Sequence, residues 1–188
     1  MVQPMDAQRP WFEQALAVVD VETTGLDPKM DRIIEIAVIR MEGGEVKNTF
    51  SCLVNPGISI SDEVANLTGI QQSQLDDAEP FSEVAAAVRE ALGDHPFVAY
   101  NANFDRAFVQ EELTRADIDW EPAIIIDPLV FIRELHRGQG SKRLGAAAER
   151  LGIPLDNAHR AADDAEVAGR ILYALQEQLP GDLEDLVL

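Results

Sequence analysis

The sequence is poor in cysteine and in long apolar runs, and each shortage excludes a class of protein. Its single cysteine, Cys52, rules out a disulfide framework and a cysteine-based zinc site, and it predicts a reduced cytoplasmic compartment. No apolar run approaches the roughly 20 residues that a membrane helix needs. The N-terminus also lacks the basic start and apolar core of a secretory signal. We therefore expect no membrane partner.

Basic residues are also scarce, with 15 Lys and Arg against 34 Asp and Glu, which gives a formal net charge of −19. Such a charge repels nucleic acid at long range and, taken alone, argues against a nucleic-acid partner. One basic island stands out in IRELHRGQGSKR, with Arg133, Arg137, Lys142 and Arg143. It is either a phosphate-binding segment or a solvated helix end with cations at its C-terminus.

The apolar periodicity predicts one α/β domain over residues 14–180, with a loose leader over 1–13 and a short tail over 181–188. Predicted strands span 16–22, 32–42, 45–54, 96–100 and 123–126. Predicted helices begin near Ser61 and span 82–92, 104–115, 128–136, 143–151 and 160–179. This order favours a mixed central sheet, an antiparallel three-strand meander plus two parallel strands, flanked by helices.

The first predicted strand carries two acidic residues, in the stretch VVDVETTGLDP. Side chains alternate along a strand, so Asp20 and Glu22 point to one face while Val19 and Val21 point to the other. Two like charges on one face of an apolar strand are costly unless a positive group lies between them. The simplest such group is a metal ion, so the strand predicts a cation site if other segments supply more ligands.

Two later segments offer such ligands. Asp105, in AYNANFDRAFV, is either a ligand or a first-turn aspartate that complements the helix dipole. In AHRAADDAEVAGRIL, Asp164 lies about 60° from the apolar stripe that begins at Ala161, whereas Asp163 lies about 160° away and should face solvent. His159 precedes Asp164 by five residues, too far round a helix to share its face, so we place it on the loop that enters the helix.

Together, VVDVETTGLDP, AYNANFDRAFV and AHRAADDAEVA resemble the three motifs of the DEDD exonucleases, in the DnaQ-like branch with a catalytic histidine. The resemblance runs from about residue 15 to 179 and includes DRIIEIAVI, LTGI and KRLGAAAERLGI. A lone Asp-x-Glu carries little information, whereas three motifs in this order are specific. The resemblance implies an RNase H-like fold and 3′-to-5′ hydrolysis of phosphodiester bonds. Single-stranded DNA is favoured over RNA, because Thr23 stands where the small-RNA enzymes of the family favour Met.

The resemblance also implies the ligands of two divalent cations, Mg²⁺ or Mn²⁺, which are Asp20, Glu22, Asp105 and Asp164. Four hard oxygen ligands from separate elements suit such ions. By analogy Asp20 bridges both ions, Glu22 and Asp164 complete one site, and Asp105 supports the other. His159 would act as the general base that takes a proton from the attacking water, since imidazole titrates near neutral pH.

Substrate contacts follow from the same resemblance. Thr23, Thr24 and Leu26 match positions that contact the 3′-terminal nucleotide, and Asn101 and Phe104 flank the site. Leu26 would lie as a wedge beside the terminal base, or would instead be a turn residue with a packing role. Substrate-binding residues of the basic island would be Arg137, Lys142 and Arg143. The implied partners are the 3′ end of single-stranded DNA or RNA and, in a proofreading role, a DNA polymerase subunit.

Other functions compete with this interpretation. A 3′-to-5′ exoribonuclease of the same family would use the same five catalytic residues. A non-catalytic binding module on this fold predicts the loss of a ligand or of the histidine, and none is lost. An acidic cation-binding protein would need a compact carboxylate loop such as D-x-D-x-D-G, which the sequence lacks.

Overall fold

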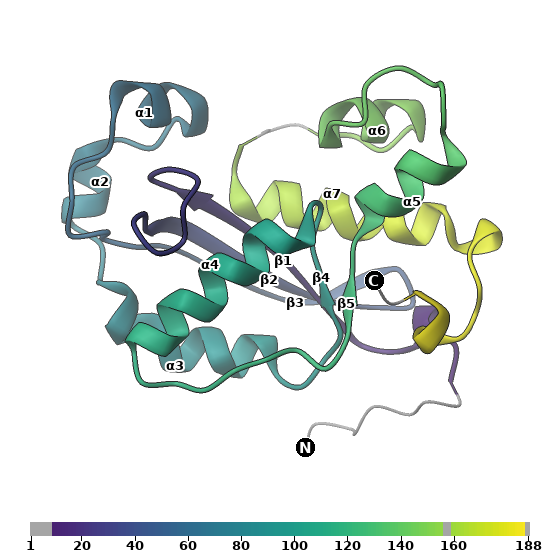
Figure 1. Ribbon diagram of the computed structural model, residues 1–188, viewed down its shortest axis with the longest axis horizontal. Helices are drawn as coiled ribbons and strands as arrows, with labels where there is room; N and C mark the ends of the chain where they lie inside the picture. The colour runs from purple at the N-terminus through teal and green to yellow at the C-terminus, as the bar shows by residue number, and fades with distance from the viewer. Residues whose placement is uncertain (1–8, 156–158, 187–188) are drawn as a thin grey trace.

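A five-stranded sheet in the order β3-β2-β1-β4-β5 forms the centre of the molecule, and helices cover both of its faces (Figure 1). The computed structural model describes residues 9–155 and 159–186. The strands are β1 (Leu16–Thr23), β2 (Ile33–Glu42), β3 (Glu45–Leu53), β4 (Phe97–Val98) and β5 (Ile125–Ile126). The helices are α1 (Asp62–Thr68), α2 (Gln72–Asp76), α3 (Phe81–Leu92), α4 (Ala102–Arg115), α5 (Pro128–Leu135), α6 (Leu144–Arg150) and α7 (Ala161–Ala174).

The sheet combines an antiparallel meander with two parallel strands, and this confirms the predicted fold class. β1 pairs antiparallel with β2, and β2 with β3, whereas β4 runs parallel to both β1 and β5. Gly43 and Gly44 join β2 to β3 with φ angles of 62° and 79°. A two-residue hairpin turn with both central residues at positive φ matches the strand twist, and glycine adopts it without strain.

The two faces of β1 bury different helices. Ala17, Val19 and Val21 belong to a core cluster with α3 and α4, while Leu16 and Val18 pack with α7. A β-carbon on Gly169 of α7 would collide with Met41 and press on Val18, so glycine permits the close approach of α7 to the sheet. The face of β1 that carries its even-numbered residues is therefore the face next to α7.

Several predicted boundaries are wrong, and tertiary contacts explain why. The last helix ends at Ala174, and a separate 3₁₀ turn, Gln176–Gln178, follows it. The predicted loose leader is packed at its C-terminal end, since Trp11 is fully buried and its backbone and indole N–H groups donate to Gly181 and Pro180 carbonyls. Leu183 and Leu186 of the C-terminal segment join the same core cluster.

The remaining predictions for the chain ends fall on residues 1–8 and 187–188, which lie outside the described residues, as do residues 156–158. The five-residue helix α2 has no counterpart in the prediction. No helix in the described part of the chain is both long enough and apolar enough to cross a membrane.

Candidate active site

Asp20 and Glu22 lie on the α7 face of β1, as the alternation predicted. Val19 and Val21, their neighbours in sequence, belong to the core cluster on the opposite face. In the antiparallel ladder Glu22 stands opposite Glu35 of β2. Directly opposed residues of an antiparallel pair share one face, so a third carboxylate joins the first two at the end of β1.

Asp105 reaches the same strand from α4. The helix starts after Asn101, whose φ of 75° lies in the left-handed region that asparagine adopts more readily than most residues. Asp105 sits in the first turn, where the helix dipole favours a negative charge, and it is 3% exposed. Its Oδ1 accepts the backbone N–H of Val21 at 3.1 Å. Because Val21 lies between Asp20 and Glu22, this hydrogen bond fixes Asp105 beside both.

Asp164 lies in the first turn of α7 and is 8% exposed, so it faces inward as predicted. Its Oδ2 accepts the backbone N–H of His159 at 3.2 Å. Its Oδ1 is buried and has no hydrogen-bond partner among the described residues. A buried carboxylate oxygen without a partner is costly. This oxygen is therefore the strongest structural sign that the site binds a cation.

His159 lies before α7 with a left-handed backbone (φ 67°) and an exposed side chain, so it is on the entry loop as predicted. One ring nitrogen of His159 and one oxygen each of Glu22 and Asp164 all lie within 4.8 Å of one another. Left-handed backbone at a residue other than glycine is concentrated at functional sites. The structure thus brings the predicted histidine next to two of the predicted carboxylates.

The electrostatics of the cluster are unfavourable without a cation. Burial raises the pKa of Asp20 well above its ordinary value, and Asp105, Asp164 and Glu22 raise it further. Burial also raises the pKa of Glu22 to about 8, with Asp164 and Glu35 adding to the effect. The pKa values of Asp105 and Asp164 are raised mainly by burial too. Four acidic groups that all resist ionisation in one place mark a functional site.

The residues present fit a divalent cation. Carboxylate oxygens are the ligands that Mg²⁺ and Mn²⁺ prefer, and four carboxylates converge here from β1, α4 and α7. A cation in this place would give Asp164 Oδ1 its partner and would relieve the repulsion among the carboxylates. The four predicted carboxylates therefore form a donor set that suits a divalent cation.

An ion pair between Glu35 and Arg160 was missing from the prediction. Glu35 is 2% exposed, and Arg160 donates to it from Nη2 at 2.8 Å and from Nε at 3.2 and 3.3 Å. Glu35 also accepts the backbone N–H of Ala161 at 3.0 Å. It therefore holds the start of α7, and with it His159, against β2. A glutamate inside the apolar run RIIEIAVIR was the signal that could have revealed it.

Asp127, also missing from the prediction, ties two helix starts together. Its Oδ1 accepts the N–H groups of Asn101 at 3.0 Å and Leu129 at 2.9 Å, and its Oδ2 accepts that of Ala102 at 3.1 Å. The carboxylate thereby fixes the N-terminus of α4, which carries Asp105. An aspartate before proline at the end of an apolar strand is a helix-start signal that could have identified it.

The residues predicted to contact the terminal nucleotide lie around this cluster. Thr23 Oγ1 donates to the Gly25 carbonyl at 2.6 Å, and Thr24 Oγ1 donates to Asp31 at 3.1 Å. Leu26 is 83% exposed. The other two predicted contacts are the exposed Asn101, which precedes α4, and the half-buried Phe104 of α4. Nucleotide contact by these five residues stays a prediction.

The loop of the basic island is closed by hydrogen bonds between its own residues. The Lys142 ammonium donates to the carbonyls of His136 at 2.6 Å and of Gln139 and Gly140 at 3.2 Å each. Arg133, Arg137 and Arg143 are exposed. Lys142 thus closes the loop, and the three arginines are the cations of the island that solvent reaches most freely. Phosphate contact by Arg137, Lys142 and Arg143 stays a prediction.

Comparison with known sequences agrees with this geometry. The profile of the RNase T exonuclease family matches residues 17–172. The chain is 36% identical over 170 residues to a DNA polymerase III PolC-type of Bacillus cereus, with 90% of this chain and 12% of the relative covered. It is 37% identical over 168 residues to the 3′-5′ exonuclease DinG of Bacillus subtilis, with 89% and 18% covered. The chain thus spans less than a fifth of the length of these relatives.

Solved structures share the fold. Exonuclease X in complex with 5′ overhanging duplex DNA superposes with a TM-score of 0.75 at 23% identity, covering 92% of this chain and 97% of that one. Exonuclease I superposes with a TM-score of 0.78 at 21% identity, covering 87% and 41%. These likenesses confirm the RNase H-like fold. With the profile match over most of its length, the chain belongs to the RNase T family of exonucleases, within the DEDD superfamily.

Proposed function

We propose that this chain is a metal-dependent 3′-to-5′ exonuclease that removes nucleotides from the 3′ end of single-stranded DNA. The observation that carries the proposal is the buried Oδ1 of Asp164, which lies beside Glu22 and His159 and has no hydrogen-bond partner within residues 9–155 and 159–186. Structural carboxylates are normally paired when buried, whereas catalytic metal sites leave their oxygens free for the ion. The family of the chain supplies the reaction class that this arrangement suits.

Two divalent cations, Mg²⁺ or Mn²⁺, would be held by Asp20, Glu22, Asp105 and Asp164. When bound, such ions stabilise the charge on the attacking and leaving oxygens of an in-line phosphodiester displacement. Asp105 and Asp164 are held by backbone N–H groups, at 3.1 and 3.2 Å respectively, so each presents an oriented carboxylate. The chain thus contributes a set of pre-positioned oxygen ligands.

His159 is the general base in this proposal and accepts a proton from the attacking water. Three features support the role: its exposure, its position on the entry loop, and a ring nitrogen close to Glu22 and Asp164. The ion pair between Arg160 and Glu35 restrains the backbone next to His159, so it limits the positions that the imidazole can take. A base must be within reach of the proton that it removes, directly or through one water.

Single-stranded DNA is the substrate that we favour, with a proofreading or repair role in the cytoplasm. The name of one relative supports DNA, since it is a PolC-type DNA polymerase III. A polymerase partner would also compensate for the net charge of −19, which predicts weak intrinsic binding to a polyanion. RNA is the alternative, because a 3′-exonuclease that recognises a histone mRNA stem-loop superposes with a TM-score of 0.74.

The test uses 5′-labelled DNA and RNA oligomers of one sequence, each incubated with Mg²⁺ or Mn²⁺. We expect a ladder that shortens from the 3′ end, faster on DNA, and that disappears with a chelator or in Asp164→Ala. Faster cleavage of RNA would replace DNA by RNA as the substrate. Intact oligomers under every condition, with protein that is folded by circular dichroism, would contradict the proposed activity.

A further inference from the structure

The loop between β1 and β2 carries the two most exposed large apolar side chains of the described residues, Leu26 at 83% and Met30 at 76%. Asp31 organises this loop, because its carboxylate accepts Thr24 Oγ1 at 3.1 Å and the Asp27 N–H at 2.9 Å. An exposed leucine on a loop beside the catalytic carboxylates can act on a substrate only if the loop itself is held in place.

Arg115, in the last turn of α4, holds it. Its guanidinium donates to the carbonyls of Pro28 at 2.9 Å, Lys29 at 2.8 Å and Asp31 at 3.4 Å. A planar guanidinium with five donors can bond several carbonyls at once, which a lysine ammonium cannot do with the same geometry. One side chain therefore fixes three carbonyl groups of the turn that follows Leu26.

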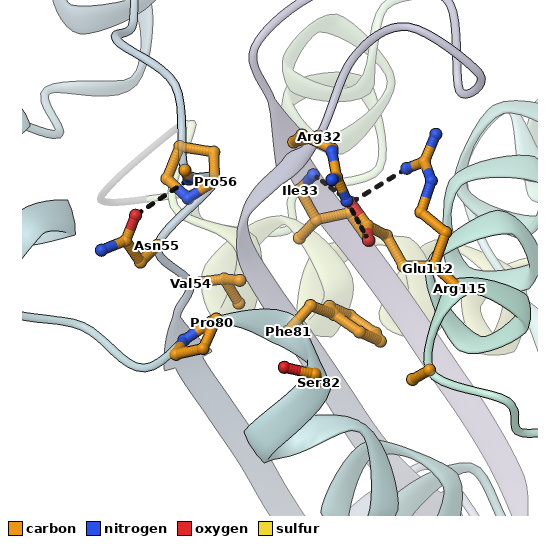
Figure 2. Close-up of a pocket in the computed structure, with 12 residues that line it drawn as sticks. Arg32, Ile33, Val54, Asn55, Pro56, Pro80, Phe81, Ser82, Glu112 and Arg115 are labelled. Atoms are coloured by element: carbon orange, nitrogen blue, oxygen red, sulfur yellow. Dashed lines mark hydrogen bonds and ion pairs between the residues drawn. The ribbon is translucent and has the colours of Figure 1, made fainter.

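Glu112 completes the clamp from one turn earlier in α4 (Figure 2). It is 2% exposed, accepts Arg32 Nη1 at 3.0 Å and the Ile33 N–H at 3.4 Å, and lies 3.3 Å from Arg115 Nη1. The cluster borders a pocket of about 270 Å³, floored by Val54 and Phe81. Since Arg115 lies at this pocket, with 25% of its side chain exposed, a smaller side chain there does not open the core.

α4 thus connects two parts of the site. Its first turn bonds Asp105 to β1 through Val21, and its last turn holds the loop that presents Leu26. The helix has 14 residues, a length of about 21 Å. Asp105 and the apolar loop are therefore both fixed to β1 and its following turn by contacts from one helix.

We propose that Arg115, supported by Glu112, is a positioning residue. By holding the loop between β1 and β2, it increases the affinity of the enzyme for the 3′-terminal nucleotide. This inference rests on the proposed exonuclease function. When the clamp is absent, the loop occupies its binding-competent conformation only part of the time. The apparent affinity is the intrinsic affinity multiplied by that fraction of time, whereas the chemistry of a correctly bound complex is unchanged.

The experiment compares Arg115→Met and Arg115→Lys with Arg89→Met. Arg89 is a matched control, because it also ends a helix and donates to a carbonyl, that of Gly93, and to Asp94, each at 2.8 Å, but on α3. Steady-state kcat and KM are measured on a DNA oligomer with an ordinary 3′ end and on one with a 3′-terminal abasic residue. The melting temperature of each variant is recorded alongside.

For Arg115→Met we expect KM to rise about 10-fold with kcat within about twofold, the result for a loop that is competent a tenth of the time. The KM of Arg115→Lys should lie between those of Arg115→Met and the wild type, and the KM of Arg89→Met should match that of the wild type. The preference for a base-bearing 3′ end over an abasic one should shrink in Arg115→Met, because the loop would then present Leu26 less often for its predicted contact with the terminal base.

An unchanged KM in both Arg115 variants would overturn the inference, and so would an equal loss of kcat on both substrates. Fluorescence anisotropy of a labelled oligomer separates this failure from that of the proposed function. Weaker binding by Arg115→Met, with no turnover by any protein, would support the clamp and overturn the exonuclease activity. Equal binding by all variants would overturn the clamp whatever the activity.

Discussion

Two buried carboxylates on opposite sides of the sheet, Glu112 and Asp164, lie in clusters that differ in how the charge is compensated. On the α4 side, Glu112 bonds Arg32 and the Ile33 N–H and has Arg115 within 3.3 Å. On the α7 side, Asp164 is nearly as buried, yet its Oδ1 has no partner in the described part of the chain, and Glu22 lies close by.

This contrast distinguishes Glu112, a carboxylate that stabilises the fold, from Asp164, a carboxylate suited to bind a ligand. A buried charge with cationic partners is compensated within the protein, and removing one partner is destabilising. A buried carboxylate among other carboxylates can be compensated only by protons or by a cation from outside. Whether a buried carboxylate stabilises the fold or binds a ligand therefore depends on whether a cationic side chain of the protein lies beside it.

Asp164→Asn gives the largest expected effect. We expect cleavage to fall about 10³-fold or more, equivalent to ~4 kcal/mol, because the cation loses a charged ligand. Without metal, the same substitution should raise the melting temperature, since it removes one of several mutually repelling charges. The measurements are single-turnover cleavage of a labelled oligomer and thermal unfolding in the presence of a chelator.

Asp163→Asn is the matched control for that prediction. Asp163 is the next residue along α7 and is only half-buried, so it should change neither activity nor metal-free stability by much. A lower melting temperature for Asp164→Asn would show that Asp164 is compensated within the protein after all. The contrast between the two clusters would then be lost.

The second-largest expected effect is the change in protein stability with pH and with added Mg²⁺. Burial raises the pKa of Glu22 from 4.5 to about 8, so the folded protein holds a proton that the unfolded chain releases in this window. The stability of the metal-free protein should therefore fall as the pH rises from about 4.5 to about 8. Mg²⁺ at 100 times its Kd should restore about 2.7 kcal/mol, or ~5–10 °C in melting temperature.

The gain from Mg²⁺ should be larger at pH 8 than at pH 5, because the ligands must lose their protons to bind the ion. Differential scanning fluorimetry with and without a chelator measures both trends. In Asp164→Asn the gain should shrink at every pH. A metal-free melting temperature that rises with pH over this window would mean that the carboxylates are not the dominant unpaired charges.

The sequence predicted the α7-side cluster because its signals are local. Alternation placed Asp20 and Glu22 on one face of β1, and a helical period of about 100° per residue placed Asp164 inward and Asp163 outward. The motifs supplied His159 and Asp105. The antiparallel meander also followed from local features, namely alternating segments around a two-glycine turn.

The compensating contacts were beyond prediction because their partners are distant in sequence. Glu35 and Arg160 are 125 positions apart, and Arg115 and Lys29 are 86 apart. No period or turn signal links such residues, since their meeting depends on the packing of α7 and α4 on the sheet. The buried Trp11 was missed for the same reason, because its partners lie near the other end of the chain.

Glu112→Ala gives the smallest of the three effects and tests the other half of the contrast. It leaves Arg32 and Arg115 without their shared carboxylate, but both arginines keep some contact with water, with side chains 39% and 25% exposed. We expect a loss of about 2 kcal/mol in unfolding free energy, the cost of an unsatisfied Ile33 N–H and of one lost carboxylate partner each for Arg32 and Arg115. Solvent partly screens both arginines, and Arg115 keeps Glu111 at 3.5 Å. Urea denaturation measures it, and the loss should be insensitive to Mg²⁺, whereas the stability change in Asp164→Asn depends on the metal. A loss that Mg²⁺ reversed would mean that the two clusters are coupled through α4 rather than independent.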